Sequence, residues 1–310
     1  MSKYFVRRLA MSVVTLWVIV TITFILMHSV PGNPFANENK NIPEVVYQNL
    51  LKKYGLDKPL SEQYLIYLKN IVRWDFGESM KSNTETVNEM IARGFPVSAQ
   101  LGLQALLIAL IIGPALGAIA ALYQNRFPDY ISMIVSIIGV SVPSFVMGTF
   151  LIQFVARNVD WLPIGGWGEW RHTILPSFAL ALMPLAQIAR LMRSSMLEVL
   201  GQDYIKTAKS KGISRTAVIL KHAVRNAILP VVSILGTTVS NLLVGSFVIE
   251  KIFGVPGLGM FFVNSIYNRD YTLIMGVTVF YAIILISMLF IVDIAYTLID
   301  PRIRLTKEGR

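Results

Sequence analysis

Five stretches of this 310-residue chain run for more than 20 residues without a single Asp, Glu, Lys or Arg. A bilayer core about 30 Å thick needs about 20 apolar residues in a helix, because every backbone polar group there must be hydrogen-bonded internally. A sixth, shorter stretch continues into Leu191 and Met192, and Arg190 can snorkel to the interface. We therefore predict an all-α, polytopic membrane protein whose six transmembrane helices cover residues 9–30, 97–122, 131–156, 172–189, 228–249 and 271–292.

The charged residues predict an orientation for these spans. One face of the predicted topology collects sixteen Lys and Arg against five acids, whereas the other face carries twelve of each. Because an excess of Lys and Arg marks the cytoplasmic side, we expect this face, with both termini, to be cytoplasmic. The net charge of +10 is then explained by topology and does not indicate nucleic-acid binding. The chain has no cysteine, which excludes disulfides and thiolate metal sites.

The predicted spans divide the chain into segments. Residues 1–8 and 300–310 are cytoplasmic ends, and residues 9–30 form the first span, since they are too long for a signal peptide and lack a cleavage site. Residues 31–96 form an extracytoplasmic segment with one helix ending at Gly55 and a second capped by Ser61. A folded cap without a ligand role is favoured for it over helices that lie on the membrane or that cover a pore mouth. Residues 97–299 form a five-helix core.

A long basic loop, residues 190–227, interrupts this core. It carries eight Lys or Arg against two acids. Asp203 can cap a helix that Gly212 stops, and Ser214 can cap the next helix, which runs to Val224. A helix of about eight residues is marginal in isolation, so it needs a partner. A groove on another protein and an anionic lipid surface are both open on charge alone.

Several kinds of chemistry are missing from the sequence. A glycine-rich phosphate loop is absent, so the chain cannot hydrolyse ATP by itself. His28, His172 and His222 lie far apart, so we expect no metal site. An intramembrane hydrolase would need an oriented serine or paired acids, and a proton-coupled transporter would need a central, partnered acid, whereas Asp293 lies near one end of the last span. We expect a protein that is not an enzyme.

The basic loop resembles the cytoplasmic coupling loop of the membrane permeases of ABC importers. It departs from their general Glu-Ala-Ala-x-x-x-Gly pattern, with Lys206-Thr207-Ala208 and then Gly212. These departures are similar to one branch, the peptide and nickel permeases, whose loop looks like Asp-Tyr-Ile-Lys-Thr-Ala-Lys-x-Lys-Gly followed by His-Ala-x-Arg-Asn-Ala. Further stretches similar to this branch are residues 31–34 (PGNP), 54–59 (YGLDKP), 75–79 (DFGES), 250–259 (EKIFGVPGLG), 268–271 (NRDY) and 300–302 (DPR).

The resemblance implies a function and a set of partners. The set of motifs is most like the B-type permeases of oligopeptide importers, with dipeptide, glutathione and nickel permeases as alternatives. It implies a bacterial inner-membrane subunit that forms the translocation path with a homologous C-type permease. Two cytoplasmic ATPases would bind ATP and Mg²⁺, an extracytoplasmic binding protein would deliver the peptide, and import would follow alternating access. This chain would hold no cofactor of its own.

The resemblance also implies two groups of site residues. The ATPase-coupling group comprises Asp203, Tyr204, Thr207, Ala208, Lys209, Gly212, Arg215, His222, Arg225 and Asn226. An external gate is implied at Glu250, Pro256, Gly257 and Gly259. For these four, a purely structural re-entrant turn is an equal alternative, because Gly and Pro serve any sharp reversal. Independently of the resemblance, Ser141, Pro143 and Ser144 suit a translocation path because they allow close helix approach, although ordinary helix packing is favoured for any one of them.

Overall fold

The computed structural model describes residues 2–30, 35, 43–82, 84–244 and 246–299, and within these ranges the chain is helical apart from turns and one isolated β-bridge, between Glu78 and Thr86. It contains two compact units, one built from Met1–Pro96 with Gly257–Phe290 and the other from Val97–Pro256 with Ile291–Arg310. The motifs at residues 31–34 and 300–302, the predicted cytoplasmic C-terminus and the side chain of Asp293 lie outside what is described.

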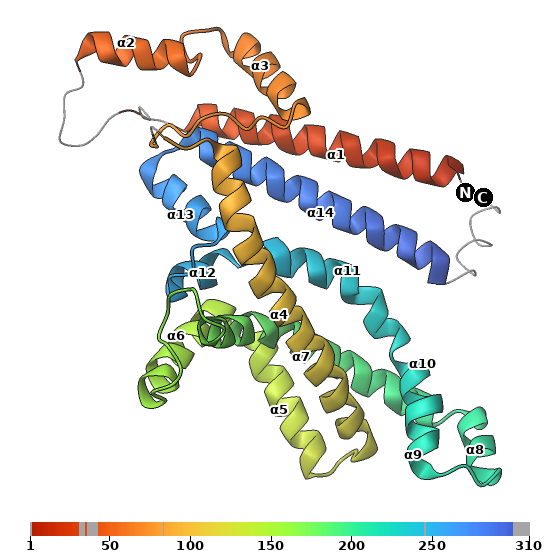
Figure 1. Cartoon of the computed structure of the whole chain (residues 1–310). Helices are drawn as coiled ribbons and strands as arrows, with labels where there is room; N and C mark the ends of the chain where they lie inside the picture. Colours follow the sequence, from red (N-terminus) through yellow and green to blue (C-terminus); the bar gives the residue numbers. More distant parts are fainter. Residues whose placement is uncertain (1, 31–34, 36–42, 83, 245, 300–310) are drawn as a thin grey trace. The chain divides into compact units, whose positions relative to one another are not determined.

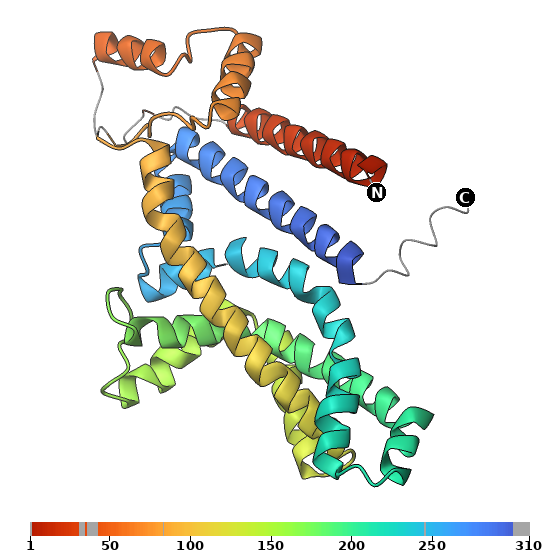
Figure 2. The same cartoon turned by 45° about the vertical axis from the view of Figure 1, so that its right-hand side comes forward.

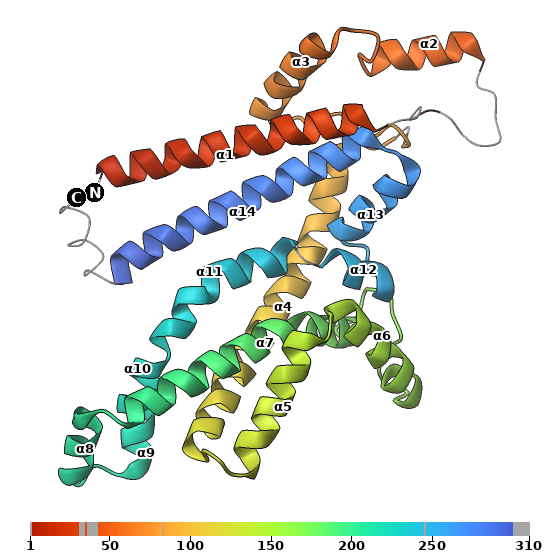
Figure 3. The ribbon, with the colours of Figure 1, turned by 180° about the vertical axis from the view of Figure 1, so that it is seen from behind.

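The first unit combines helices from the N-terminal part of the chain with two helices from its C-terminal part. Its helices are α1 (Ser2–Ser29), α2 (Glu44–Lys53), α3 (Leu60–Val72), the start of α4 (Val87–Leu122), α13 (Leu258–Asn268) and α14 (Tyr271–Ile299) up to Phe290. α1 and α14 run side by side in all three views (Figures 1, 2 and 3). Most of α1 presents large apolar side chains to the outside, as a helix facing lipid does.

The second unit holds the main apolar core. It contains the rest of α4, α5 (Phe127–Ser141), α6 (Ser144–Phe154), the short helix η1 (Ala156–Asn158), α7 (Arg171–Leu200), α8 (Asp203–Ser210), α9 (Arg215–Ala217), the π-helix η2 (Val218–Val224), α10 (Arg225–Ala227), α11 (Leu229–Val244) and α12 (Phe247–Phe253). α7 packs against α5, α6, α11 and α12. Small residues permit the close approach: a Cβ on Gly117 would lie 2.4 Å from the carbonyl oxygen of Ala189.

The number of membrane-spanning helices agrees with the predicted number only in part. Four described helices are long and apolar enough to cross a membrane, and up to seven spans result if each of three broken helix pairs is one span. The predicted number of six falls inside this range and stays a prediction. α4 begins ten residues before the predicted span at Val97, and α7 runs to Leu200, eleven residues beyond the predicted end at Ala189.

Two of the predicted spans are not single continuous helices. The stretch 131–156 is divided into α5 and α6, whose axes differ by 111° when the short continuation to Asn158 is included. Pro143 has no N–H and disfavours helical geometry in the preceding residue, and Val142 is extended, with φ −93° and ψ 119°. The stretch 228–249 likewise ends as α11 at Val244, and a separate α12 starts at Phe247.

The predicted helix caps had mixed outcomes. Ser214 does cap its helix, because its hydroxyl accepts a hydrogen bond from the backbone N–H of Ala217. Asp203 and Ser61 do not act as caps. Gln202 and Pro59 precede the two helices instead, and Asp203 and Ser61 are the first and second helical residues. An acid in the first turn still favours the helix through its dipole.

Candidate functional site

The basic loop is a folded extension of the second unit. The helices α8, α9, η2 and α10 follow the end of α7 and lie together at one end of that helix (Figures 1 and 3). We call residues 203–227 the loop module. In α8, Ile205 and Ala208 are buried at 0% and 6% exposure. They pack in one apolar cluster with Met192, Met196, Val218, Ala223 and Ala227. α8 is therefore anchored to the last turns of α7.

The outer face of α8 is polar and exposed. Asp203 forms an ion pair with Lys206, with 2.9 Å between Oδ1 and Nζ, and both side chains are largely exposed. The hydroxyl of Thr207 donates to the carbonyl oxygen of Asp203 at 3.0 Å. Lys209 is also exposed. An exposed pair of this kind stabilises a helix by well under about 1 kcal/mol. The fold therefore does not depend on the polar face of α8, and this face is available to bind a partner.

Gly212 ends α8 in a Schellman motif. Its backbone φ is +76°, in the left-handed region. Its N–H donates to the carbonyl of Lys209 at 3.0 Å, and the N–H of Ile213 donates to the carbonyl of Ala208 at 3.3 Å. A Cβ at this position would meet nothing within 4 Å. Glycine is needed here for its backbone freedom and not for space.

The second half of the loop module is tied to α8 by an amide. The side-chain N–H₂ of Asn226 donates to the hydroxyl of Tyr204 at 3.0 Å and to the carbonyl of His222 at 3.0 Å. Three residues of the predicted coupling group, 22 positions apart at most, thus meet in one hydrogen-bonded cluster. Arg215 and Arg225 are exposed. All ten predicted coupling residues lie in the loop module.

The sequence did not predict a buried ion pair that lies between α5 and α7. Arg193 on α7 binds Asp129 on α5 through two contacts, of 2.6 Å from Nε to Oδ1 and 2.7 Å from Nη2 to Oδ2. The backbone N–H of Asn125 also donates to Asp129, which is 3% exposed. The one sequence feature that could have indicated this pair is Asp129 itself, an acid just before the apolar stretch 131–156. This pair fixes α5 to α7 next to the loop module.

The predicted path residues are divided between the two units. Ser141 ends α5, Pro143 precedes α6 and Ser144 begins it, so these residues form the helix break. Glu250 lies in α12, is 0% exposed and accepts a hydrogen bond from the hydroxyl of Ser246. α6 and α12 pack closely: a Cβ on Gly148 would be 3.1 Å from Ile249 Cδ1.

The end of α12 is a sharp turn. Gly254 has a φ of +64°, and the carbonyl of the preceding Phe253 accepts a hydrogen bond of 2.7 Å from Gly166. Pro256 is the last residue of the segment Val97–Pro256 of the second unit. Gly257 precedes α13 and the buried Gly259 lies inside α13, and both belong to the first unit. A structural turn and a gate remain alternatives for these residues.

In the first unit, three of the motif stretches meet. The hydroxyl of Ser79 donates to the carboxylate of Asp270, which also accepts from the N–H groups of Met80 and Leu273, both at 3.1 Å. The hydroxyl of Tyr54 donates to the carbonyl of Ser79 at 2.8 Å. Asp270 is 2% exposed and caps the start of α14. Residues 54–59, 75–79 and 268–271 are thus joined by hydrogen bonds.

Comparison with known proteins identifies the family. Residues 113–305 match the family described as "Binding-protein-dependent transport system inner membrane component", and residues 1–102 match the N-terminal model of such membrane components. The chain belongs to this family of inner-membrane permeases. It is accordingly a multi-pass membrane protein of binding-protein-dependent transport.

Curated relatives are similar over their whole lengths. The dipeptide transport system permease protein of Bacillus subtilis is 53% identical over 309 residues, which is 100% of both chains. The oligopeptide transport system permease protein of Haemophilus influenzae is 45% identical over 98% of this chain and 100% of its own. The dipeptide transport system permease protein of Lactococcus lactis is 42% identical, with the same coverage.

Proposed function

We propose that this chain is a transmembrane permease subunit of an ATP-driven peptide importer. It forms the translocation path with a homologous C-type permease. Two cytoplasmic ATPases hold ATP and Mg²⁺, and an extracytoplasmic binding protein delivers the peptide. ATP binding closes the ATPases and opens the spans outward, and hydrolysis resets them inward. The full-length similarity to peptide permeases supports the substrate class.

The loop module carries the proposal of coupling. A short helix can transmit a movement only if it is rigidly attached to the element that it moves. Here Ile205 and Ala208 bury α8 against the end of α7, while its polar face, with Thr207 and Lys209, stays exposed for a partner. The exposed face docks on an ATPase, and α7 moves with it. Both termini lie on this cytoplasmic side.

Substitution of Gly212 tests the coupling role. A β-branched residue in the left-handed region costs about 1–2 kcal/mol, so Gly212→Val distorts the end of α8. Gly212→Asn is the matched control, because Asn tolerates this conformation. We expect Gly212→Val to lower both ATPase co-purification and peptide uptake, and Gly212→Asn to retain them. Unchanged assembly and uptake in Gly212→Val would contradict the coupling role.

For the substrate, we propose oligopeptides, and dipeptides are the second candidate. The whole set of motifs favours the first, whereas the 53% identity to a dipeptide permease favours the second. Uptake of a labelled pentapeptide is measured in cells with and without the chain, in competition with an unlabelled pentapeptide, dipeptide, glutathione or Ni²⁺. Competition by the pentapeptide alone supports oligopeptides, whereas stronger competition by the dipeptide assigns the transporter to dipeptides.

The energy source separates this proposal from a secondary transporter. Membrane vesicles that hold a proton gradient but no ATP should import no peptide, and added ATP should restore uptake. Uptake driven by the gradient alone would instead assign the chain to proton-coupled transport. Peptide cleavage without a partner chain would assign it to the intramembrane hydrolases.

We also propose that the helix break at Ser141, Pro143 and Ser144, together with Glu250, Pro256, Gly257 and Gly259, lines the path or its external gate. A buried acid such as Glu250 in an apolar span is costly and therefore favours a functional role. Glu250→Gln keeps the shape of the side chain and removes its charge. A loss of uptake with intact assembly supports the gate, and unchanged uptake favours the purely structural turn.

A further inference from the structure

The first unit contains a cavity that none of the proposed path or gate residues lines. Its volume is about 610 Å³, which is within the usual range for small-molecule sites. The end of α1 and the start of α14 form one side of it, and α2, α3 and residues 75–80 form the other. Since α1 and α14 are long enough to span a membrane, their ends place this cavity at the membrane interface.

Two tyrosine hydroxyls in the wall of the cavity have no hydrogen-bond partner among the described residues. Tyr67 on α3 and Tyr271 at the start of α14 both line the cavity, and the oxygen of each is buried. Burial raises the pKa of the Tyr67 phenol well above its ordinary value, so this group remains a donor at physiological pH. Buried polar groups are almost always paired in proteins. Two unpaired donors in one cavity therefore point to a ligand with acceptor oxygens.

The charges around the cavity favour an anion. Lys52, Lys53 and Lys58 line it, against the carboxylates of Asp75 and Glu78. Lys53 is paired with Glu78 at 2.7 Å, and Lys58 is paired with Glu62 at 2.8 Å. Asp75 accepts from the backbone N–H of Gly77 at 2.9 Å. Lys52 forms no ion pair with any residue that the structure describes, which leaves its charge for a ligand.

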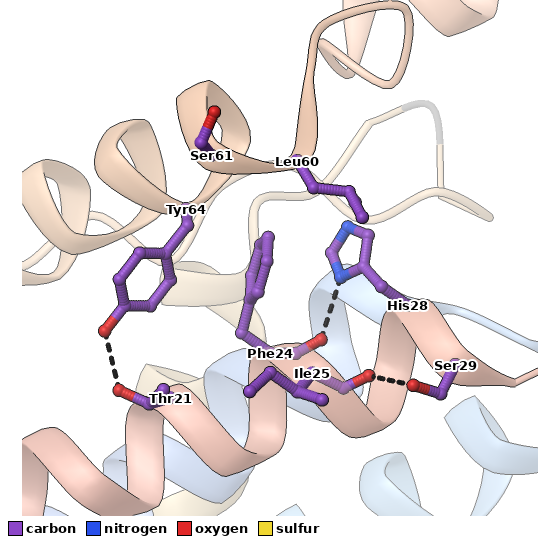
Figure 4. Close-up of a pocket in the computed structure, with 8 residues that line it drawn as sticks. All are labelled: Thr21, Phe24, Ile25, His28, Ser29, Leu60, Ser61 and Tyr64. Carbon is purple, nitrogen blue, oxygen red and sulfur yellow. Dashed lines mark hydrogen bonds between the residues drawn. The ribbon is translucent and has the colours of Figure 1, made fainter.

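A second, apolar groove is lined by residues of α1 and α3 (Figure 4). It has a volume of about 300 Å³ and lies between α1 and α3. Phe24 and His28 line both spaces. The groove is closed at its other end by a hydrogen bond of 2.6 Å between the hydroxyls of Thr21 and Tyr64. A polar cavity with Lys52 in its wall, beside an apolar groove, suits a ligand with an anionic head and an apolar chain.

We propose that this cavity binds the headgroup of an anionic phospholipid, whose phosphate accepts hydrogen bonds from Tyr67 and Tyr271 and whose acyl chain lies in the groove beside Phe24. Basic cavities next to spanning helices bind anionic headgroups in this way. A water-soluble peptide would gain little from a groove at the membrane interface. The lipid fixes α3 and residues 75–80 to the ends of α1 and α14.

Native mass spectrometry of the transporter that contains this chain tests the proposal. The detergent-purified complex is titrated with dioleoylphosphatidylglycerol, with dioleoylphosphatidylcholine and with glycerol 3-phosphate. We expect tighter binding of the phosphatidylglycerol. The Tyr67→Phe/Tyr271→Phe double variant should bind it about tenfold or more weakly, because each hydroxyl donates to a charged oxygen. Tyr64→Phe, on the same helix but with its hydroxyl already paired, should leave the affinity within about twofold.

Each of the other outcomes would overturn the proposal. Equal binding of the two lipids would mean that only the apolar groove attracts them. Equal binding of glycerol 3-phosphate and phosphatidylglycerol would indicate a site for a soluble phosphate ester. An unchanged affinity in the double variant, which removes no hydrogen bond that the structure records, would leave the two hydroxyls without a role in binding. Peptide uptake is measured in parallel on the same variants. Because lipid binding is read by mass spectrometry and transport by uptake, failure of the lipid proposal can be told apart from failure of the proposed transport function.

Discussion

The loop module and the external segment of residues 43–82 are both helical extensions of the spanning helices, yet they are held in opposite ways. α8 buries Ile205 and Ala208 in an apolar cluster. α2 and α3 contain no buried residue at all and are held by hydrogen bonds and ring contacts, such as that of Tyr67 with Phe24. Apolar burial suits an element that must pass on a movement, whereas scattered polar ties suit an element that surrounds a cavity.

The largest expected effect concerns the support of the loop module. Asp129→Asn leaves Arg193 partly buried without a counter-charge, which destabilises the fold by about 3 kcal/mol. Lys206→Ala breaks the exposed pair with Asp203 and should change stability by less than about 0.5 kcal/mol. Thermal unfolding in one detergent compares the two variants. Equal unfolding temperatures for the two variants would show that the Asp129–Arg193 pair does not stabilise this region.

A cavity in the loop module should be nearly as costly. Ile205→Ala removes a fully buried side chain and should cost about 2–4 kcal/mol, with release of α8 from α7. Leu65→Ala on α3, where Leu65 is 65% exposed, should have almost no effect in the absence of a membrane. Limited proteolysis at the α8 loop reads out the release. Similar proteolysis of the two variants would abolish the contrast between the regions.

In the external segment, a single polar tie should matter most. Ser79→Ala takes one donor from the buried Asp270 carboxylate and should cost about 1–3 kcal/mol. Ser61→Ala is the control, since Ser61 is exposed and does not cap α3. Hydrogen exchange of residues 75–80 and of the first turn of α14 is the measurement. If exchange there is unaffected by Ser79→Ala, the polar tie does not hold the segment.

The smallest effect is a titration. Burial raises the pKa of the Tyr54 phenol above its ordinary value of 10.0. A raised folded pKa favours the protonated form, so the stabilisation is complete below pH 10.0 and is lost as the pH rises through the folded pKa. The absorbance difference between the native protein and Tyr54→Phe should show half-ionisation of the phenol above pH 10.0. A midpoint at or below pH 10.0 would contradict the packing around Tyr54.

These contrasts indicate what the sequence alone could predict. Uncharged length predicted the apolar helices, and Gly212 with Ser214 predicted the helix-turn-helix layout, because left-handed geometry and hydroxyl capping are local effects. The helix ends at Ser141 and Val244 were not predicted, because hydropathy does not report the direction of the backbone. Pro143 was a local sign of the first of these ends. Asp129 with Arg193, and Ser79 with Asp270, join residues 64 and 191 positions apart, and no local pattern reports such pairs.

The most direct test of the coupling account is site-specific cross-linking from the loop module. The chain contains no cysteine, so a single cysteine at Thr207, on the exposed face of α8, carries a photoreactive maleimide without background labelling. A cysteine at the exposed Leu65 of α3 is the matched control. The account predicts a cross-link from position 207 to the ATPase, with a yield that changes on ATP binding, and none from position 65. Absence of an ATPase cross-link at position 207 in an assembled, transporting complex would contradict it.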